Sequence, residues 1–200
     1  TTGDHNVGVG VDSLTAVTSG GHNVGVGRNT LKSTTTATYN TAVGDAALDV
    51  NTTGSDNVGV GADALGQNTE GGSNVAIGAY ALDASTTGSE NTAVGTSALS
   101  ANTTAGNNTA VGRMALRDNT TGADNTALGH QAMISNTTGS NNTAVGKSAF
   151  DANTTGTGNT ALGRRAMYNN TTANYNTSVG YNSLYYNTTG DQNVAGGQSA

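Results

Sequence analysis

The sequence contains no cysteine, no proline and no tryptophan, and only 4% of its 200 residues are aromatic. The absence of cysteine excludes a disulfide framework and a thiolate metal site. The absence of proline means that no residue removes a backbone donor from a hydrogen-bond ladder. Hydrophobic residues make up 34% of the chain, which is too few for a thick globular core.

Basic residues are also scarce. Seven Lys and Arg against 13 Asp and Glu give a formal net charge of −6, which disfavours a nucleic-acid-binding protein. No apolar run approaches the length of a membrane span, and no signal-peptide pattern is present. We therefore expect no nucleic-acid partner and no membrane insertion in this segment. Both ends of the chain fall inside a repeat, which favours an excerpt of a longer protein.

What the sequence has in abundance is a repeat of 17 residues, without insertion or deletion. Each unit opens on an asparagine, counted here as position 1: Asn6, Asn23, Asn40, Asn57, Asn74, Asn91, Asn108, Asn125, Asn142, Asn159, Asn176 and Asn193. Position 5 is always Gly, and position 13 is always Thr, from Thr1 to Thr188. Residues 1–200 therefore form a single repeat array with no separate domain.

Other positions conserve size rather than identity between units. Position 3 is always Ala, Gly or Ser, and position 8 is Ala, Ser or Thr. Position 4 is Val, Ile or Leu except at Gly196, and position 9 is Leu, Met or Phe. Positions 6, 7, 10, 11, 16 and 17 vary and hold nearly all the charge.

The repeat predicts an all-β fold. Positions 1–4 read as a strand, the Gly at position 5 as a corner, and the "NTTG" of positions 12–15 as a second corner that tolerates left-handed conformations. The residues between the corners fit either a second strand or a short helical turn. Strand-paired coils repeat at about 4.8 Å, whereas packed helices need roughly 8–10 Å, so we expect a parallel β-solenoid (β-roll) of about twelve coils, possibly with one helical turn per coil.

In such a stack each repeat position becomes a column. We expect the asparagines of position 1 to form a hydrogen-bonded ladder, with a less complete one at position 12. An apolar spine is predicted from position 9, joined by position 4: Leu99, Leu116, Met133, Phe150 and Met167 with Val94, Val111, Leu128, Val145 and Leu162. This core is thin. The small residues at positions 3 and 8 suggest that the backbone there lies close to a neighbouring part of the assembly. Further copies of the chain would supply the missing burial.

The stretch "SNVAIGAYALDASTTGSENTAVG" (73–95) resembles the repeats in the heads of YadA-like trimeric autotransporter adhesins. The nearest match is Asn74, Val75, Ala76, Ile77 and Gly78. The form "NTAVG…AL…NTTG" also resembles repeat arrays in predicted bacteriophage tail-fibre proteins. The resemblance implies a left-handed β-roll wound by three chains into an adhesive or spacer rod, although these units are longer than the usual adhesin-head unit.

Catalytic chemistry has little support. None of His5, His22 and His130 recurs with a carboxylate and a nucleophile at a fixed spacing, so we expect no catalytic residue and no cofactor. His5 and His22 share position 17 on adjacent coils, so they could lie close together and bind a metal, but we favour two exposed residues without a metal. The nearest acidic group, Asp45, Asp49, Asp56 and Asp63, is spread over four repeat positions.

The "NTT" corner carries two further hypotheses. Glycosylation could occur at the asparagines of position 12, Asn51, Asn102, Asn119, Asn136, Asn153, Asn170 and Asn187, but a turn-forming role is favoured. The Thr columns at positions 13 and 14 could form an array that orders water against ice. Adjacent Thr residues point to opposite faces of a strand, however, which weakens the array.

One pattern of charge stands out in this acidic chain. Position 6 reads Arg113, His130, Lys147 and Arg164 on four consecutive coils. Like charges opposite each other are destabilising, so these side chains either extend into water or meet an anionic surface. That surface could be an acidic glycan or a carboxylate of a neighbouring chain.

The sequence therefore predicts a non-enzymatic structural or adhesive fibre at a cell surface or on a virion, such as a tail-fibre shaft or an adhesin filament. We expect a homo-oligomer, with a trimer favoured, and a glycan or cell-surface receptor as partner. An ice-binding solenoid is the alternative.

Overall fold

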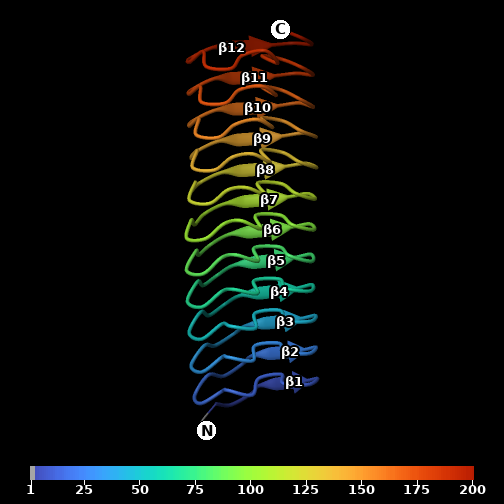
Figure 1. The fold of residues 1–200 in the computed structure, drawn as a ribbon, viewed down its shortest axis with the longest axis vertical. Coiled ribbons are helices and arrows are strands. Elements are labelled where there is room, and N and C mark those ends of the chain that lie inside the picture. The colour runs from blue at the N-terminus through green and yellow to red at the C-terminus, as the bar shows by residue number, and fades with distance from the viewer. Residues whose placement is uncertain (1–2) are drawn as a thin grey trace.

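The computed structural model describes residues 3–200 and has one short strand in each repeat. The strands are β1 (Val7–Val9), β2 (Val24–Val26), β3 (Thr41–Val43), β4 (Val58–Val60), β5 (Val75–Ile77), β6 (Thr92–Val94), β7 (Thr109–Val111), β8 (Thr126–Leu128), β9 (Thr143–Val145), β10 (Thr160–Leu162), β11 (Thr177–Val179) and β12 (Val194–Gly196). They form one 12-stranded sheet in sequence order, stacked as a straight column (Figure 1). The expected all-β parallel solenoid is confirmed. Thr1, the first threonine of position 13, lies outside the described residues.

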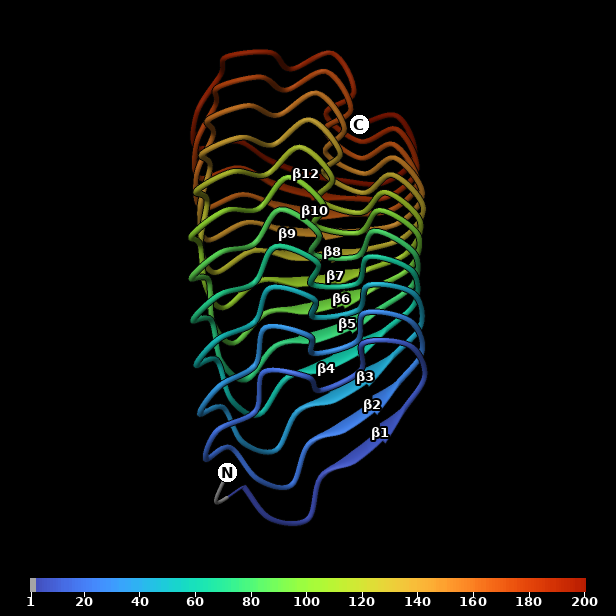
Figure 2. The same cartoon turned by 60° about the horizontal axis from the view of Figure 1, so that its bottom comes forward.

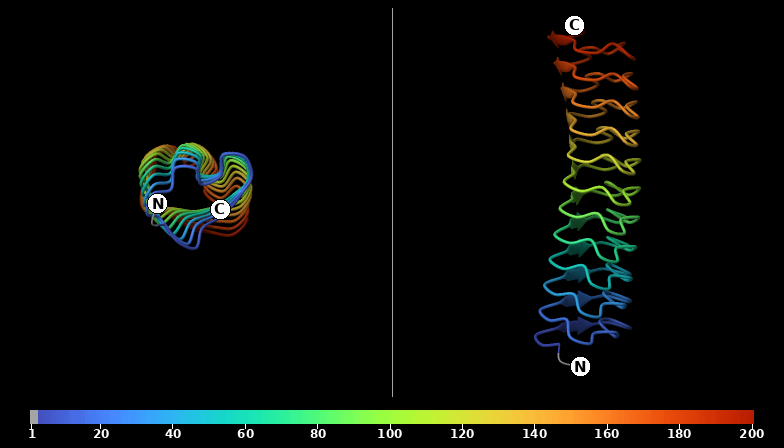
Figure 3. Two further views of the ribbon diagram at one scale, coloured as in Figure 1. Left: turned by 90° about the horizontal axis from the view of Figure 1, so that it is seen from below. Right: turned by 90° about the vertical axis from the view of Figure 1, so that its left-hand side faces the viewer.

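Strand pairing is parallel and keeps one register throughout. β7 pairs with β8 so that Thr109 faces Thr126 and Ala110 faces Ala127, each 17 residues further along. Every repeat position therefore stacks on itself. Figure 2 shows the resulting columns along the rod, and Figure 3 shows a cross-section that is flat along the strands and indented elsewhere.

The second half of each coil is a series of turns. Residues 3–200 contain no helix and no second strand per coil, so both alternatives for this segment are wrong. The backbone instead becomes left-handed at positions 7, 9 and 17, as at Met114 (φ 59°), Leu116 (φ 51°) and Asp124 (φ 58°). Left-handed residues at positions 7 and 9 prevent a right-handed helical turn from forming. The "NTTG" corner is not where the left-handed residues lie.

These turns are joined to their neighbours as closely as the strands are. In one coil, the Asp63 N–H donates to Asp45 O (2.9 Å), Leu65 N–H to Ala81 O (3.0 Å) and Thr69 N–H to Thr86 O (2.9 Å). The hydrogen-bond ladder therefore surrounds the whole coil, and buried backbone groups are satisfied without long strands.

The interior is built from positions 3, 8 and 9, which corrects the predicted spine. Ala127 at position 3 is fully buried, whereas Leu128 at position 4 is 39% exposed. The spine of Leu99, Leu116, Met133, Phe150 and Met167 is fully buried, as predicted. The proposed second file of Val94, Val111, Leu128, Val145 and Leu162 points outward on the sheet. The small residues at positions 3 and 8 face the coil's own core, not another chain.

Space explains this inversion. A 17-residue coil already encloses the large side chain of position 9 and two polar columns, so only a methyl-sized group fits at position 3. The left-handed conformation that turns Leu116 inward costs about 1–2 kcal/mol. Full burial of a leucine side chain contributes roughly 1.5–3 kcal/mol, which offsets that cost.

The asparagines of position 1 form the predicted ladder, and it is unbroken. Asn108 Oδ1 accepts from the Asn125 N–H (3.0 Å), while its amide donates to Gly122 O (2.9 Å) in its own coil. The same Oδ1 contact to the next backbone N–H recurs at every step from Asn6 to Asn193. Each asparagine thus ties one coil to the next and closes its own loop.

The second ladder, at position 12, has gaps. From Asn119 to Asn153 each amide donates to the Oδ1 of the preceding coil, as Asn119 does to Asn102 (3.1 Å). Ser85 interrupts the column. Among the described residues, the Ser85 hydroxyl and Asn68 Oδ1 are buried without a hydrogen-bond partner. Each such group lowers the free energy of unfolding.

Replacing Ser85 with asparagine is expected to repair this gap. The new amide would reach Asn68 Oδ1, and its oxygen would accept from Asn102, as in the intact part of the column. We expect a gain of about 1 kcal/mol and a higher thermal midpoint by circular dichroism. Ser100→Asn, at the variable position 10, is the matched control. An equal shift in both variants, or none in Ser85→Asn, would contradict the prediction.

Candidate interaction surfaces

The outer face of the sheet is a continuous uncharged band. Position 2 contributes only Thr or Val and position 4 only Val, Ile or Leu, with Gly196 the single exception. These side chains alternate with the buried position 3, so they all lie on one face. Ile77 (41% exposed) and Leu162 (37%) are typical of position 4. A contiguous apolar stripe along a whole molecule marks an interaction surface.

This face was missed by the sequence reasoning, although its signal was present. Position 2 exchanges Thr and Val freely, as between Thr92 and Val75, and neither position 2 nor position 4 ever carries a charge. Free exchange of a hydroxyl for a methyl is typical of a half-exposed site rather than a core, since a buried hydroxyl needs a partner.

The predicted stripe of position 6 is present as a neighbouring file of side chains. Arg113, Lys147 and Arg164 are exposed and His130 is half-buried. Arg113 Nη1 lies 3.4 Å from His130 Nε2. The file continues onto Tyr181, whose hydroxyl accepts from Arg164 Nη1 (3.3 Å) and whose ring centre is 5.4 Å from the Arg164 guanidinium carbon.

The same column is neutralised at the other end of the rod. Arg28 makes a two-pronged contact with Asp45 of the next coil, at 2.9 and 2.6 Å. This hydrogen bond and the charge of Asp45 raise the pKa of Arg28 above its ordinary value. The described residues contain two further ion pairs, Lys32 with Asp12 (3.6 Å) and Arg117 with Asp118 (2.7 Å). None of the three involves the stripe.

The "NTT" corner is committed to internal contacts. The asparagines of position 12 are fully buried from Asn51 to Asn170, and the amides of Asn51 to Asn153 donate inside the coil; Asn119, for example, donates to Gly122 O (2.9 Å). Only Asn187 is half-buried. This geometry favours the turn-forming role over glycosylation, because a sugar must be attached to an accessible amide.

The threonines of position 13 are similarly occupied. The Thr120 hydroxyl donates to Thr137 O (3.0 Å) and that of Thr137 to Thr154 O (2.9 Å), and the pattern repeats along the rod. Only position 14, such as Thr121, stays exposed. One column of free hydroxyls remains where the ice-binding hypothesis needs two.

The histidines of position 17 stack rather than converge. The rings of His5 and His22 are parallel at 4.8 Å between centroids, and Tyr39 continues the stack at 4.8 Å. Parallel rings do not direct two nitrogens at one ion. Residues 3–200 contain no cluster of three or more potential metal ligands.

Of the acidic residues of the first half, Asp45 is ion-paired with Arg28. Burial raises the pKa of Asp49, the charge of Lys32 lowers it, and the charges of Asp63 and Asp45 raise it. Burial, and then the charge of Asp63, raises the pKa of Asp83. Asp56 lies at position 17, in a different column.

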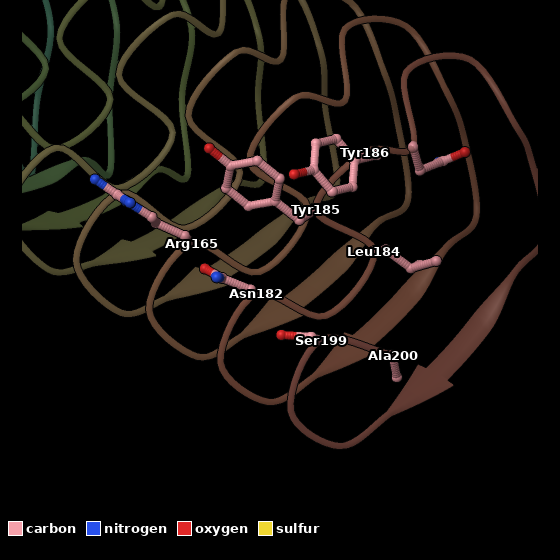
Figure 4. A pocket seen from close by; sticks show the side chains of 8 residues that line it. Arg165, Asn182, Leu184, Tyr185, Tyr186, Ser199 and Ala200 are labelled. Atoms are coloured by element: carbon pink, nitrogen blue, oxygen red, sulfur yellow. The ribbon is translucent and has the colours of Figure 1, made fainter.

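A pocket of about 530 Å³ opens at the last coil (Figure 4). It is lined by Arg165, Asn182, Leu184, Tyr185, Tyr186, Asn187, Ser199 and Ala200. Arg165, Asn182 and Ser199 share position 7 on three successive coils, and Leu184 is the position 9 residue of the last complete coil.

Residues 3–200 form no helix with the length and apolarity that a membrane span requires. No family model, curated protein or solved structure matches the chain. The candidate surfaces therefore rest on the repeat, the two asparagine columns and the outward face alone.

Proposed function

We propose that the chain is a non-enzymatic structural segment of an extracellular fibre, such as a tail-fibre shaft or an adhesin-like filament at a cell surface. The observation that carries this is the unbroken register of one sheet and one asparagine ladder from β1 to β12. Such a stack resists bending because every coil is bonded all round its perimeter. Twelve coils at about 4.8 Å give a rod about 55 Å long.

The uncharged sheet face supports assembly from several copies. Its two files of side chains repeat once per coil, so a partner must have the same axial spacing to pack against them over many coils. Another copy of this chain, lying parallel, has that spacing. Copies arranged around an axis parallel to the rod would bury this face, and we favour three of them, as in closed cyclic assemblies.

A charge placed on this face is expected to break the assembly. Val145→Lys puts an ammonium group in the middle of the face, where a partner would have to desolvate it. By light scattering after size exclusion, the wild type should have about three times the chain mass of 19.6 kDa, and the variant the mass of one chain. The matched control is Thr155→Lys, at the exposed position 14 of the same coil, which should leave the mass unchanged.

The same measurement separates the alternatives. A wild-type mass of 19.6 kDa would overturn the assembly. A monomer that shows thermal hysteresis, lost in Val145→Lys, would instead assign the face to ice, which also presents a regular lattice. For the fibre we expect no hysteresis, because the Thr hydroxyls of position 13 are bonded within the rod.

A further inference from the structure

The charge of the rod is divided unequally along its length. Residues 1–100 contain two of the seven basic residues and nine of the thirteen acidic ones, whereas residues 101–200 contain five and four. An acidic half is therefore followed by a slightly basic one. Three of the five cations of the basic half, Arg113, Lys147 and Arg164, lie in a single file, the stripe of position 6.

These cations have no anionic partner within the described chain. Arg113, Lys147 and Arg164 take part in none of its ion pairs. Two of the four carboxylates of this half are engaged elsewhere, Asp118 with Arg117 and Asp191 with the Asn174 N–H (2.6 Å), and none of the four forms an ion pair with the stripe. Like charges in one column are unfavourable in the absence of a ligand, because neighbouring coils are only about 4.8 Å apart.

We propose that this stripe binds a linear anionic polysaccharide carrying one carboxylate or sulfate per sugar, laid along the rod from Arg113 to Tyr181. This goes beyond the fibre proposed above, since a rod could form without any such ligand. Guanidinium groups suit carboxylate and sulfate because they donate two parallel hydrogen bonds. In Arg28 the structure contains this contact already made, to Asp45.

The spacing of the charges selects this class of polymer. Successive coils are about 4.8 Å apart, comparable to the length of one sugar ring; Lys147 and Arg164 have this spacing, and Arg113 lies two coils before Lys147. A nucleic acid strand carries a phosphate about every 3.4 Å and is held mainly by several aromatic platforms. The stripe ends on one such platform, Tyr181, with the guanidinium of Arg164 over it. A single exposed ring beside a cation suits the flat face of a sugar.

The test uses the full chain and a decamer of galacturonic acid, with its methyl ester as the uncharged ligand of the same shape. Binding is measured by calorimetry at 50 and 200 mM NaCl. The acid should bind the wild type and the ester should bind far more weakly. Arg113→Ala/Lys147→Ala/Arg164→Ala should lower the affinity for the acid at least about tenfold and reduce the slope of log K against log salt by about two. These side chains are exposed, so circular dichroism should show an unchanged fold.

A second triple variant separates the stripe from overall charge. Arg28→Ala/Lys32→Ala/Arg117→Ala also removes three positive charges, taking the net charge from −6 to −9, but only from ion-paired sites. It should keep the affinity within about twofold, since paired cations are already neutralised.

Four results would overturn the proposal. They are no binding of the acid by the wild type, an equal loss in both triple variants, equal binding of a thymidine decanucleotide, and a stripe variant whose only change is a lower assembly mass. The last would assign the stripe to a neighbouring chain. Because affinity and mass are measured separately, the fibre can stand if the polysaccharide does not.

Discussion

Replacing Gly61 with alanine is expected to break the rod at one coil. Gly61 has φ +136°, in a region that residues with a side chain rarely adopt, and its column does so in every unit. A Cβ there would lie 2.6 Å from both the carbonyl carbon and oxygen of Gly78 in the next coil. Neither backbone strain nor this clash can relax without opening the stack, so we expect a loss of at least about 3 kcal/mol.

Gly66 supplies the matched control within the same coil. It is not left-handed, and the nearest atom to an added Cβ is Asp83 Oδ1 at 2.9 Å, on a side chain that can move. Gly66→Ala should change the thermal midpoint by at most a few degrees. Hydrogen exchange localises the effect: in Gly61→Ala, amides of β4 and β5 should lose protection first. Equal stability of the two alanine variants would refute the role assigned to position 5.

Replacing Asn108 with leucine should have an effect of similar size through a different cause. The two side chains have the same branched skeleton of four heavy atoms, so the core stays filled while the polar contacts are lost. The Asn125 N–H loses its acceptor inside the coil, whereas Gly122 O loses one donor but keeps the Asn119 amide. A buried N–H without a partner costs about 1–3 kcal/mol, and the lost hydrogen bond to Gly122 O costs about 0.5–1.5 kcal/mol more.

The control for the asparagine ladder is the neighbouring residue, Thr109. Its side chain lies on the outer face at position 2, where other units carry Val, so Thr109→Val should be neutral in stability. Chemical denaturation of the three proteins measures the difference. If Asn108→Leu were as stable as Thr109→Val, the ladder would be a consequence of stacking rather than a cause of it.

The fold was predictable at the repeat positions where only one residue type satisfies the structural requirement. Seventeen residues without a gap fix the register, Gly61 and its equivalents mark a corner that other residues do not tolerate, and Asn108 and its equivalents form a ladder because an amide can both donate and accept. These inferences required only the comparison of units within the chain.

Which face of each strand is buried could not be predicted in the same way. Alternation assigns Ala127 and Leu128 to opposite faces but does not say which face is inside, and hydrophobicity alone favours the larger residue. The structure reverses that choice because the interior is already filled by position 9 and by two asparagine columns. The width of the core depends on how the whole coil closes, so it cannot be inferred from the residues of one strand.

The left-handed turns were hidden for a related reason. Leucine has no preference for φ near +50°, so nothing local in the sequence marks position 9. Its conformation is imposed by the hydrogen bond of its N–H to the next coil and by burial of its side chain. Of the stripe, the four basic residues were identifiable, but their link to Tyr181 and the contrast with the paired Arg28 required coordinates.

The constant register of the coils also has a consequence for heredity. Because each coil presents to the next the same contacts that it receives, loss or gain of one whole unit brings together two coils that still fit. A deletion that is not a whole number of units displaces the asparagine ladder and the glycine corner downstream of it. Recombination between near-identical units of the gene can thus change the length in steps of 17 codons, while the cross-section and the chemistry of each face are inherited unchanged.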